Sequence, residues 1–199
     1  MILIGASGHA KVILDILERN NRDIKCLVDA NPNIKQLCGY KVEHDADFDF
    51  TKKQAILSIG SNSIRKKLAE ELPCDFVIGI HPQSVLDSTV SVKEGTVIMA
   101  GVVINRDTQV GKHVIVNTSA SIDHDCIVND FVHISPNATL CGTVHIAEGT
   151  HIGAGAVVSP NIKIGKWAII GAGAVVIRDI PDFAVVVGNP GKIIKYTNG

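Results

Sequence analysis

The chain has 199 residues and a formal net charge of −1, which is enough sequence for one or two domains with a sizeable core. The near-neutral charge and an aromatic content of 4% exclude a basic face or a base-stacking platform for nucleic acid. Five cysteines without a CxxC pair indicate reduced thiols and not a disulfide framework. No apolar run reaches membrane-spanning length, so the sequence predicts a soluble, cytoplasmic protein.

Residues 1–79 alternate strand patterns with helix patterns. Short apolar runs bounded by Gly, Asp or Pro are typical of buried strands, and apolar residues at helical spacing separate them. The expected elements are strands at 2–4, 24–28, 55–59 and 76–80, and helices at 9–19 and 64–72. This order predicts a small parallel, Rossmann-like α/β domain.

From Ile80 to Val176, every sixth residue is Ile, Leu or Val, and a small or β-branched residue stands two positions before each. Six residues is the period of the hexapeptide β-helix, in which three strands complete one triangular coil and residues eighteen apart stack. We therefore expect a parallel β-helix over residues 80–180. A solenoid needs its open end covered, so the tail at 181–199 is expected to be the cap.

Three loops should meet at the carboxyl edge of the N-terminal sheet, where parallel sheets bind ligands. Gly5-Ala6-Ser7-Gly8-His9 joins a strand to a helix and is either a phosphate-binding turn or a plain one. Asp29 ends the second strand and either holds a ribose or sugar hydroxyl or caps a turn. Gly60-Ser61-Asn62 ends the third strand. Together the three loops predict a nucleotide site.

Histidine is the natural general base at neutral pH, and His124 stands at a corner of the solenoid between Asp123 and Asp125. A carboxylate beside an imidazole fixes its tautomer and raises its basicity. His133 and His151 are eighteen apart and should stack in one column, with His145 on another face. Zinc ligation by the solenoid histidines is the alternative.

Small residues also form columns. Ala154 stacks with Ala172, and Gly155 with Gly173, at the eighteen-residue spacing. Such columns leave a groove for a long, thin ligand, or they meet the need of tight corners for small residues.

These features resemble the hexapeptide-repeat acyltransferases, and within them the sialic acid O-acetyltransferase and UDP-N-acetylbacillosamine N-acetyltransferase group. The resemblance covers essentially the whole chain. The motifs that carry it are Gly5-Ala6-Ser7-Gly8-His9, Ile59-Gly60-Ser61-Asn62-Ser63-Ile64-Arg65, Asn117-Thr118-Ser119, Asp123-His124-Asp125-Cys126 and Gly188-Asn189-Pro190.

The resemblance implies a left-handed β-helix, a homotrimer with active sites between subunits, and acetyl-CoA as co-substrate without a metal. His124 would be the general base and Asp125 its acidic partner. The acetyl-CoA residues implied are His133, Gly142, Ala154 and Ala172. The nucleotide-sugar residues implied are Ser7, Gly8, His9, Asp29, Ala30 and Gly60.

The chain departs from the family at two positions. Asp29-Ala30 stands where some members have two aspartates, and Asp125 stands where some relatives have glutamate. The activity implied is acetyl-CoA-dependent N-acetylation of the 4-amino group of a nucleotide-linked 4-amino-4,6-dideoxy sugar. O-acetylation of sialic acid or a related sugar is the rival enzyme activity. A non-catalytic nucleotide-sugar-binding scaffold is the rival of another class.

Overall fold

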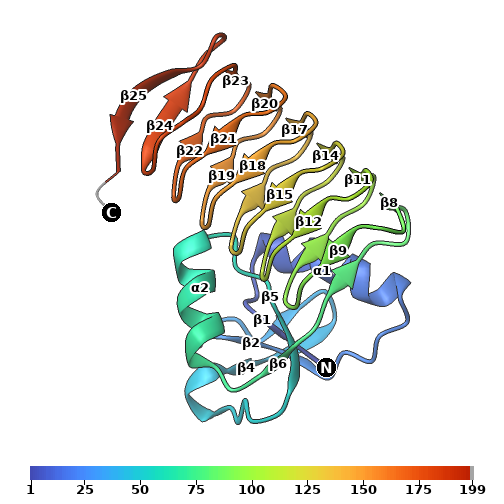
Figure 1. Ribbon diagram of the computed structural model, residues 1–199. Helices are drawn as coiled ribbons and strands as arrows, with labels where there is room; N and C mark the ends of the chain where they lie inside the picture. Colours follow the sequence, from blue (N-terminus) through green and yellow to red (C-terminus); the bar gives the residue numbers. More distant parts are fainter. Residues whose placement is uncertain (198–199) are drawn as a thin grey trace.

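The computed structural model describes residues 1–197 and consists of an α/β domain followed by a long solenoid of parallel strands (Figure 1). The predicted fold class is confirmed: parallel pairing joins β1 to β2 and β5 in the first part, and each solenoid strand to the strand eighteen residues on in the second. None of the helices in this part of the chain is long and apolar enough to cross a membrane.

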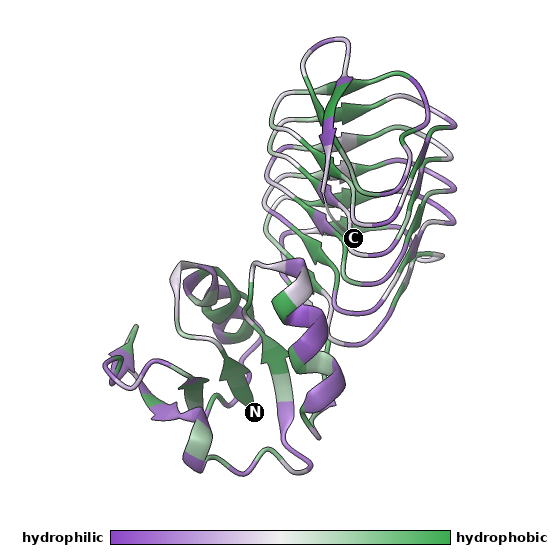
Figure 2. Ribbon diagram, turned by 90° about the vertical axis from the view of Figure 1, so that its left-hand side faces the viewer, coloured by the Kyte–Doolittle hydropathy of each residue, from purple (hydrophilic) through white to green (hydrophobic). Residues whose placement is uncertain are grey.

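The N-terminal sheet has six strands in the order β3-β4-β2-β1-β5-β6. Their bounds are β1 Ile2–Ile4, β2 Cys26–Asp29, β3 Gln36–Leu37, β4 Tyr40–His44, β5 Gln54–Leu57 and β6 Asp75–Phe76. The antiparallel hairpin of β3 and β4 adds an edge that the sequence pattern did not predict. The central strands appear as a hydrophobic layer in Figure 2, since β1, β2 and β5 are almost wholly buried.

Two α-helices and one short 3-10 helix (Asp45–Asp47) accompany the sheet. Helix α1 (Gly8–Arg19) is amphipathic and buries Ala10, Ile13, Leu14, Ile16 and Leu17. Helix α2 (Asn62–Glu71) begins at Ser61, whose hydroxyl caps it, and its single fully buried residue is Arg65. Leu68 and Ala69 of this helix pack, partly buried, against the N-terminal sheet, whereas Arg65 makes polar contacts with the solenoid.

The solenoid has three faces built of two-residue strands. The first face contains β7 Gly79–Ile80, β10 Val97–Ile98, β13 Ile115–Val116, β16 His133–Ile134, β19 His151–Ile152 and β22 Ile169–Ile170. The second contains β8 Val85–Leu86, β11 Val103–Ile104, β14 Ser121–Ile122, β17 Thr139–Leu140, β20 Val157–Val158 and β23 Val175–Val176. The third contains β9 Ser91–Val92, β12 Gln109–Val110, β15 Ile127–Val128, β18 His145–Ile146 and β21 Lys163–Ile164. We call the corners between them the first–second, second–third and third–first corners.

The sixfold pattern sets which residues face inward. The second residue of each strand from β10 to β23 is buried in one continuous core, as Val128 and Ile146 show. The small residue two positions earlier is buried as well, for example Cys126 and Val132. Each such Val or Ile stabilises the fold by about 1.5–3 kcal/mol. The predicted register is therefore confirmed.

One residue in each corner adopts the left-handed backbone region, with the same period of six. From residue 95 to residue 173 these positions are glycine at Gly95, Gly101, Gly149, Gly155 and Gly173. At nine others the residue has a side chain, namely Asp107, His113, Ser119, Asp125, Phe131, Asn137, Thr143, Asn161 and Trp167. This conformation is costly for a side-chain-bearing residue, so the repeated turn must be held by the ladders on either side.

The α/β domain packs on the first face of the solenoid. Val97 and Ile115 point outward from that face, yet they are buried in one cluster with Leu3 and Ile16 of the N-terminal domain. The strand expected at 76–80 is wrong as a single element. It divides into β6, which completes the N-terminal sheet, and β7, which pairs with β10 as the first strand of the solenoid.

The far end of the solenoid is closed by two more strands (Figure 1). Strand β24 (Ala184–Val187) pairs with β22 and extends the first face, and β25 (Lys192–Tyr196) folds back antiparallel to β24. Ala184 and Val186 enter the solenoid core. The apolar side chains of β25 are exposed, so β24 supplies the side chains that close the core.

Candidate functional site: two groups of histidines

The His124–Asp125 pair lies on the second–third corner, between β14 and β15. His124 Nδ1 and an Asp125 carboxylate oxygen are 2.7 Å apart, and both side chains are more than half exposed. The hydrogen bond that the imidazole donates to Asp125, with the charge of Asp123 added, raises the pKa of His124 above its ordinary value. Since Nδ1 is engaged, Nε2 is the nitrogen that can accept a proton.

The rest of the corner positions this pair. The His124 backbone N–H donates to Asp123 at 2.9 Å, and Asn105 donates to the same carboxylate oxygen at 2.9 Å. A side chain at Gly142, one coil further on, would place its Cβ 2.6 Å from the imidazole. Gly142 therefore lies directly beside the His124 ring, at a position where only glycine leaves room for that ring. A small cavity of about 230 Å³ begins at Asp123 and runs over the second face.

A second group of histidines crosses the first face beneath the N-terminal domain. The rings of His133 and His151 stack with centroids 4.8 Å apart, as the column prediction required, and His9 of helix α1 lies 6.5 Å from His133. His145 lies on the third face, also as predicted. The Asn117 amide donates to His133 Nε2 at 3.2 Å, and its own oxygen accepts from the Thr118 backbone. Asn117 thereby fixes the orientation of the His133 ring.

Burial and positive charge keep these histidines neutral. Burial, followed by the charges of His151 and Arg65, lowers the pKa of His133 to about 3. Burial and Arg65 lower the pKa of His9 to about 4. Within residues 1–197, His9 Nε2 and His133 Nδ1 are buried nitrogens without a hydrogen-bond partner. Both nitrogens are enclosed by protein atoms at the junction between the two domains.

Arg65 fastens the N-terminal domain to the solenoid. Its guanidinium donates to the carbonyls of His113 at 2.8 Å and Phe131 at 2.9 Å, and to that of Ile59 at 3.0 Å. The side chain is 1% exposed, and burial lowers its pKa to about 9. Hydrogen bonds to a charged group contribute about 1.5–3 kcal/mol each. The motif that contains Arg65 did not predict this role, because a single arginine in a polar helix gives no sign of burial.

The carboxyl edge of the N-terminal sheet holds a cavity of about 650 Å³. Asp29 and Ala30, both predicted substrate residues, line it beside Gly5 and Ile59. Asp29 accepts from the backbone N–H of Ala6 at 2.6 Å and of Asn31 at 2.8 Å, so its carboxylate also holds the first turn in place. Asp29 therefore caps a turn, as one of its two predicted roles required. The cavity that it lines also leaves room for a ligand.

The remaining predicted residues fall around this edge and at one corner. Ser7 is the N-cap of α1 without a side-chain capping bond, and Gly8 is its first residue. Gly60 has open space where a Cβ would stand. Ala154 and Ala172 are exposed on the first–second corner, one coil apart.

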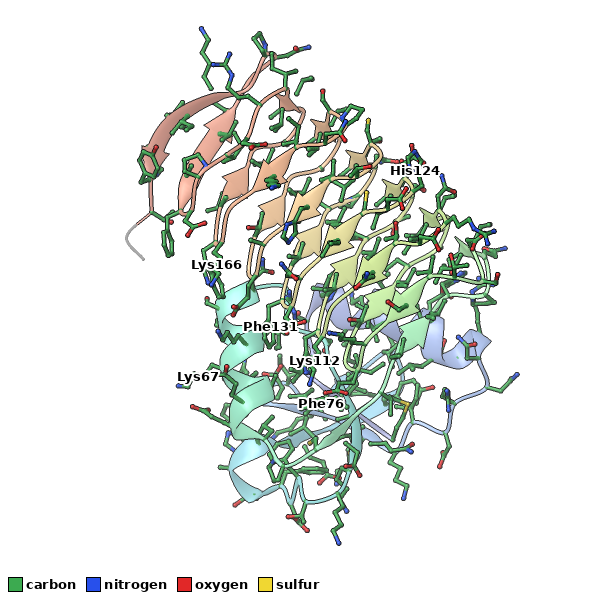
Figure 3. All side chains as sticks on the ribbon, viewed as in Figure 1. Lys67, Phe76, Lys112, His124, Phe131 and Lys166 are labelled. Carbon is green, nitrogen blue, oxygen red and sulfur yellow. The ribbon has the colours of Figure 1, made fainter. Side chains whose placement is uncertain are left out.

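Within one chain, the predicted residues form four groups, of which Asp29 and Ala30 at the edge of the N-terminal sheet are one. His124 with Gly142 occupies the second–third corner, Ala154 with Ala172 the first–second corner, and His133 the first face with His9 and Gly60 nearby. Figure 3 shows His124 on the side of the solenoid away from α2, with Phe131 on the side of α2. In the described residues no cluster of three His, Cys, Asp or Glu side chains could hold a metal ion.

Comparison with known proteins agrees with both halves of the fold. The family described as the PglD N-terminal domain matches residues 1–72, and the bacterial transferase hexapeptide family (six repeats) matches residues 143–178. A curated relative, UDP-N-acetylbacillosamine N-acetyltransferase of Bacillus subtilis, is 38% identical over 109 residues, 49% of this chain. That match spans half the length of the relative.

Two solved structures match over almost the full length. A histidine variant of perosamine N-acetyltransferase from Caulobacter crescentus, in complex with CoA and GDP-perosamine, is 35% identical and covers 98% of this chain and 96% of its own, with a TM-score of 0.94. The acetyltransferase domain of PglB from Neisseria gonorrhoeae is 32% identical and covers 97% of this chain and 98% of its own, with a TM-score of 0.90.

The fold and these matches define a hexapeptide-repeat transferase with a PglD-type N-terminal domain. Within that class, the chain belongs to the family of sugar N-acetyltransferases that includes perosamine N-acetyltransferase of Caulobacter crescentus. The resemblance drawn from the sequence motifs is confirmed.

Proposed function

We propose that the protein transfers the acetyl group of acetyl-CoA to the 4-amino group of a nucleotide-linked 4-amino-4,6-dideoxy sugar. The observation that carries the proposal is the exposed His124–Asp125 pair, whose hydrogen bond leaves Nε2 open and raises the pKa of the imidazole. The relatives support the substrate class, because one acts on a UDP-linked amino sugar and another binds CoA with GDP-perosamine.

In the proposed reaction, the sugar amine attacks the thioester carbonyl while His124 Nε2 takes its proton. The tetrahedral intermediate then collapses, the C–S bond breaks, and the proton passes to the departing thiolate of CoA. Backbone N–H groups or the neutral His133, whose ring Asn117 orients, would stabilise the oxyanion. The scheme needs no acyl-enzyme, so Cys126 and Cys141 have no chemical role in it.

We propose that the active protein is a homotrimer with each site between two subunits. The outward residues of the second face carry no charge: Val85, Val103, Ser121, Thr139, Val157 and Val175. On the third face the same row includes His145 and Lys163. Packing the second face against a copy would bring the first–second corner of one chain near the second–third corner of another. The acetyl-CoA residues would then form one groove.

The substrate class is tested by a turnover panel. Acetyl-CoA is supplied with GDP-, UDP- and dTDP-linked 4-amino-4,6-dideoxyhexoses, and free sialic acid is the O-acetylation control. The expected result is N-acetylation of at least one nucleotide-linked amino sugar and none of sialic acid. Turnover of free sialic acid alone would assign the protein to the O-acetyltransferases. Binding without turnover in any arm would favour a non-catalytic scaffold.

A further inference from the structure

The start of helix α2 binds a column of backbone carbonyls at the third–first corner of the solenoid (Figure 1). His113, Phe131 and Gly149 are eighteen residues apart and share the left-handed corner conformation. Arg65 Nε donates to the His113 carbonyl at 2.8 Å, and Arg65 Nη2 donates to the Phe131 carbonyl at 2.9 Å. Asn62 Nδ2 donates to the Gly149 carbonyl at 3.0 Å. Two side chains of α2 therefore bind the same position in three successive coils.

The guanidinium of Arg65 also holds the loop that precedes α2. Arg65 Nη1 donates to the carbonyls of Ile59 at 3.0 Å and of Gly60 at 3.4 Å. Arg65 Nη2 donates to Asn62 Oδ1 at 2.9 Å, which orients that amide for its bond to the solenoid. Arginine presents five N–H donors in a planar fork, and a lysine ammonium group cannot reproduce this set of contacts. One buried side chain thus joins the loop, the helix and the solenoid.

The loop lies between two parts of the proposed site. Ile59 lines the cavity proposed for the nucleotide. The backbone of Gly60, the next residue, lies close enough to the His133 ring to oppose the lowering of the pKa of that ring. His133 is a predicted acetyl-CoA residue on the first face. A displacement of the loop would therefore move a bound nucleotide sugar relative to the acetyl group.

Anchoring of the N-terminal domain alone does not explain an arginine at this position. Its side chain is 1% exposed, and its acceptors within residues 1–197 are five backbone carbonyls and one amide oxygen, all of them neutral. A buried charge without a carboxylate partner costs free energy that an apolar side chain would not. The apolar cluster that includes Ile16 and Ile115 already joins the two domains. What Arg65 adds to that cluster is a fixed orientation of the loop.

We infer that Arg65 is a positioning residue of the acetyl transfer. It holds the Gly60 loop against the solenoid and so fixes the distance and angle between the nucleotide cavity and His133 of the same subunit. Since its side chain is buried, Arg65 acts through the loop and touches neither substrate. The inference rests on the proposed function and adds to it a residue that sets the geometry between the two domains.

Arg65→Lys in the full chain tests the inference, because it keeps the charge and removes the planar fork. With the nucleotide sugar that the turnover panel identifies, kcat should fall about 10²-fold, the effect expected when reacting groups are displaced by about 1 Å. The Kd values of the corresponding bare diphosphate and of acetyl-CoA should stay within about twofold, because the side chains that line those sites are unchanged. Steady-state thiol release measures kcat, and calorimetry measures the two Kd values.

Asn62→Ala is the second variant, and it decides the question if Arg65→Lys fails to fold. It removes the bond to Gly149 and one acceptor of Arg65, so kcat should fall about tenfold at unchanged Kd values. Lys66→Gln is the matched control, because the bond of Lys66 runs from the same helix to Glu148 of the solenoid and does not involve the loop. Its kcat should stay within about twofold of wild type. Melting temperatures verify that each variant is folded.

Three results would overturn the inference and leave the proposed function standing. Wild-type kcat in every folded variant of Arg65 and Asn62 would show that their contacts only anchor the domain. A rise in the Kd of the bare diphosphate that matches the fall in kcat would make Arg65 a determinant of the nucleotide cavity. An equal loss of kcat in Lys66→Gln would assign the effect to any weakening of the junction. Absence of turnover by the wild type with every nucleotide sugar would overturn the proposed function itself, and this inference with it.

Discussion

The two groups of histidines in this protein have opposite environments. His124 is exposed on a corner with a carboxylate on either side in sequence, and its pKa is raised. His9 and His133 are largely enclosed between the two domains, near a buried arginine, and their pKa values are lowered to about 4 and about 3. One chain thus holds an exposed imidazole whose pKa is raised and two enclosed imidazoles whose pKa values are lowered.

The difference supports the proposal that one residue carries the proton transfer. At pH 7 a general base must take up a proton readily and release it again, which requires a pKa near the working pH. The raised pKa of His124 favours proton uptake, whereas protonating His133 would add a charge to a buried position beside Arg65. We therefore propose His124 as the residue that takes the proton, with His133 as a neutral ring that orients or polarises a substrate.

Replacing the proposed base should have the largest effect. His124→Ala should lower kcat by about 10²–10⁴-fold, the usual contribution of general base catalysis. The Kd of acetyl-CoA should change little, because the other predicted contacts to it remain. Stopped-flow or steady-state thiol release measures kcat, and calorimetry measures binding.

His133→Asn is the matched variant, since it keeps a neutral hydrogen-bonding group where the ring stands. It should retain more activity than His124→Ala. An enzyme in which His124→Ala stays within a few-fold of wild type while His133→Asn loses turnover would reverse the two assignments.

Acid should destabilise the junction between the domains. Burial keeps the pKa of His9 and His113 at about 4 in the folded chain, below the ordinary value of 6.5. Between these two pH values the unfolded chain binds more protons than the folded chain does. The free energy of unfolding is therefore highest above pH 6.5 and decreases as the pH falls towards 4. The loss is about 1.4 kcal/mol per pH unit for each such histidine. Urea unfolding at pH 7.5 and pH 5 measures it.

His113→Phe sharpens this test. The His113 ring stacks on the ring of Phe131. Both residues have the left-handed backbone conformation of their corners, so a phenylalanine can adopt it. The variant should fold and should show a shallower loss of stability in acid. Identical pH dependence in the variant and the wild type would show that His113 is not among the groups responsible.

Asp125→Asn should have the smallest effect. The pKa of His124 is raised mainly by its hydrogen bond to the Asp125 carboxylate, and a neutral amide accepts a weaker one, so the acid limb of kcat/KM should move to lower pH. The maximal rate should fall by about tenfold, less than in His124→Ala, because Asp125 acts through the imidazole. The pH profile of kcat/KM measures this shift. An acid limb at the same pH as in the wild type would show that Asp125 does not influence the pKa of the catalytic base.

The repeat made much of the solenoid predictable. Because residues eighteen apart stack, the sequence placed His133 over His151 and gave the inward register without any three-dimensional information. The carboxylate beside His124 was also foreseeable, since a corner lets sequence neighbours meet. Both predictions depend on local spacing.

The junction between the domains could not be predicted in the same way. His9 and His133 meet because α1 docks on the first face, a contact across more than a hundred residues that leaves no periodic signal. The same holds for Arg65, which reaches carbonyls of two solenoid corners. The β3–β4 hairpin was missed because its two-residue strand β3 is too short to show an alternating pattern.

Subunit complementation is the most direct test of the proposed site between two subunits. In that site, His124 of one subunit takes the proton of a sugar bound at the Gly60 loop of another subunit. His124→Ala removes the base, and Gly60→Phe fills the open space at the substrate loop. Each variant alone should be nearly inactive. Mixed, refolded trimers should recover about a quarter of the wild-type sites, since one junction in four pairs an intact His124 with an intact loop. No recovery from correctly assembled mixed trimers would contradict the shared site and place both groups in one subunit.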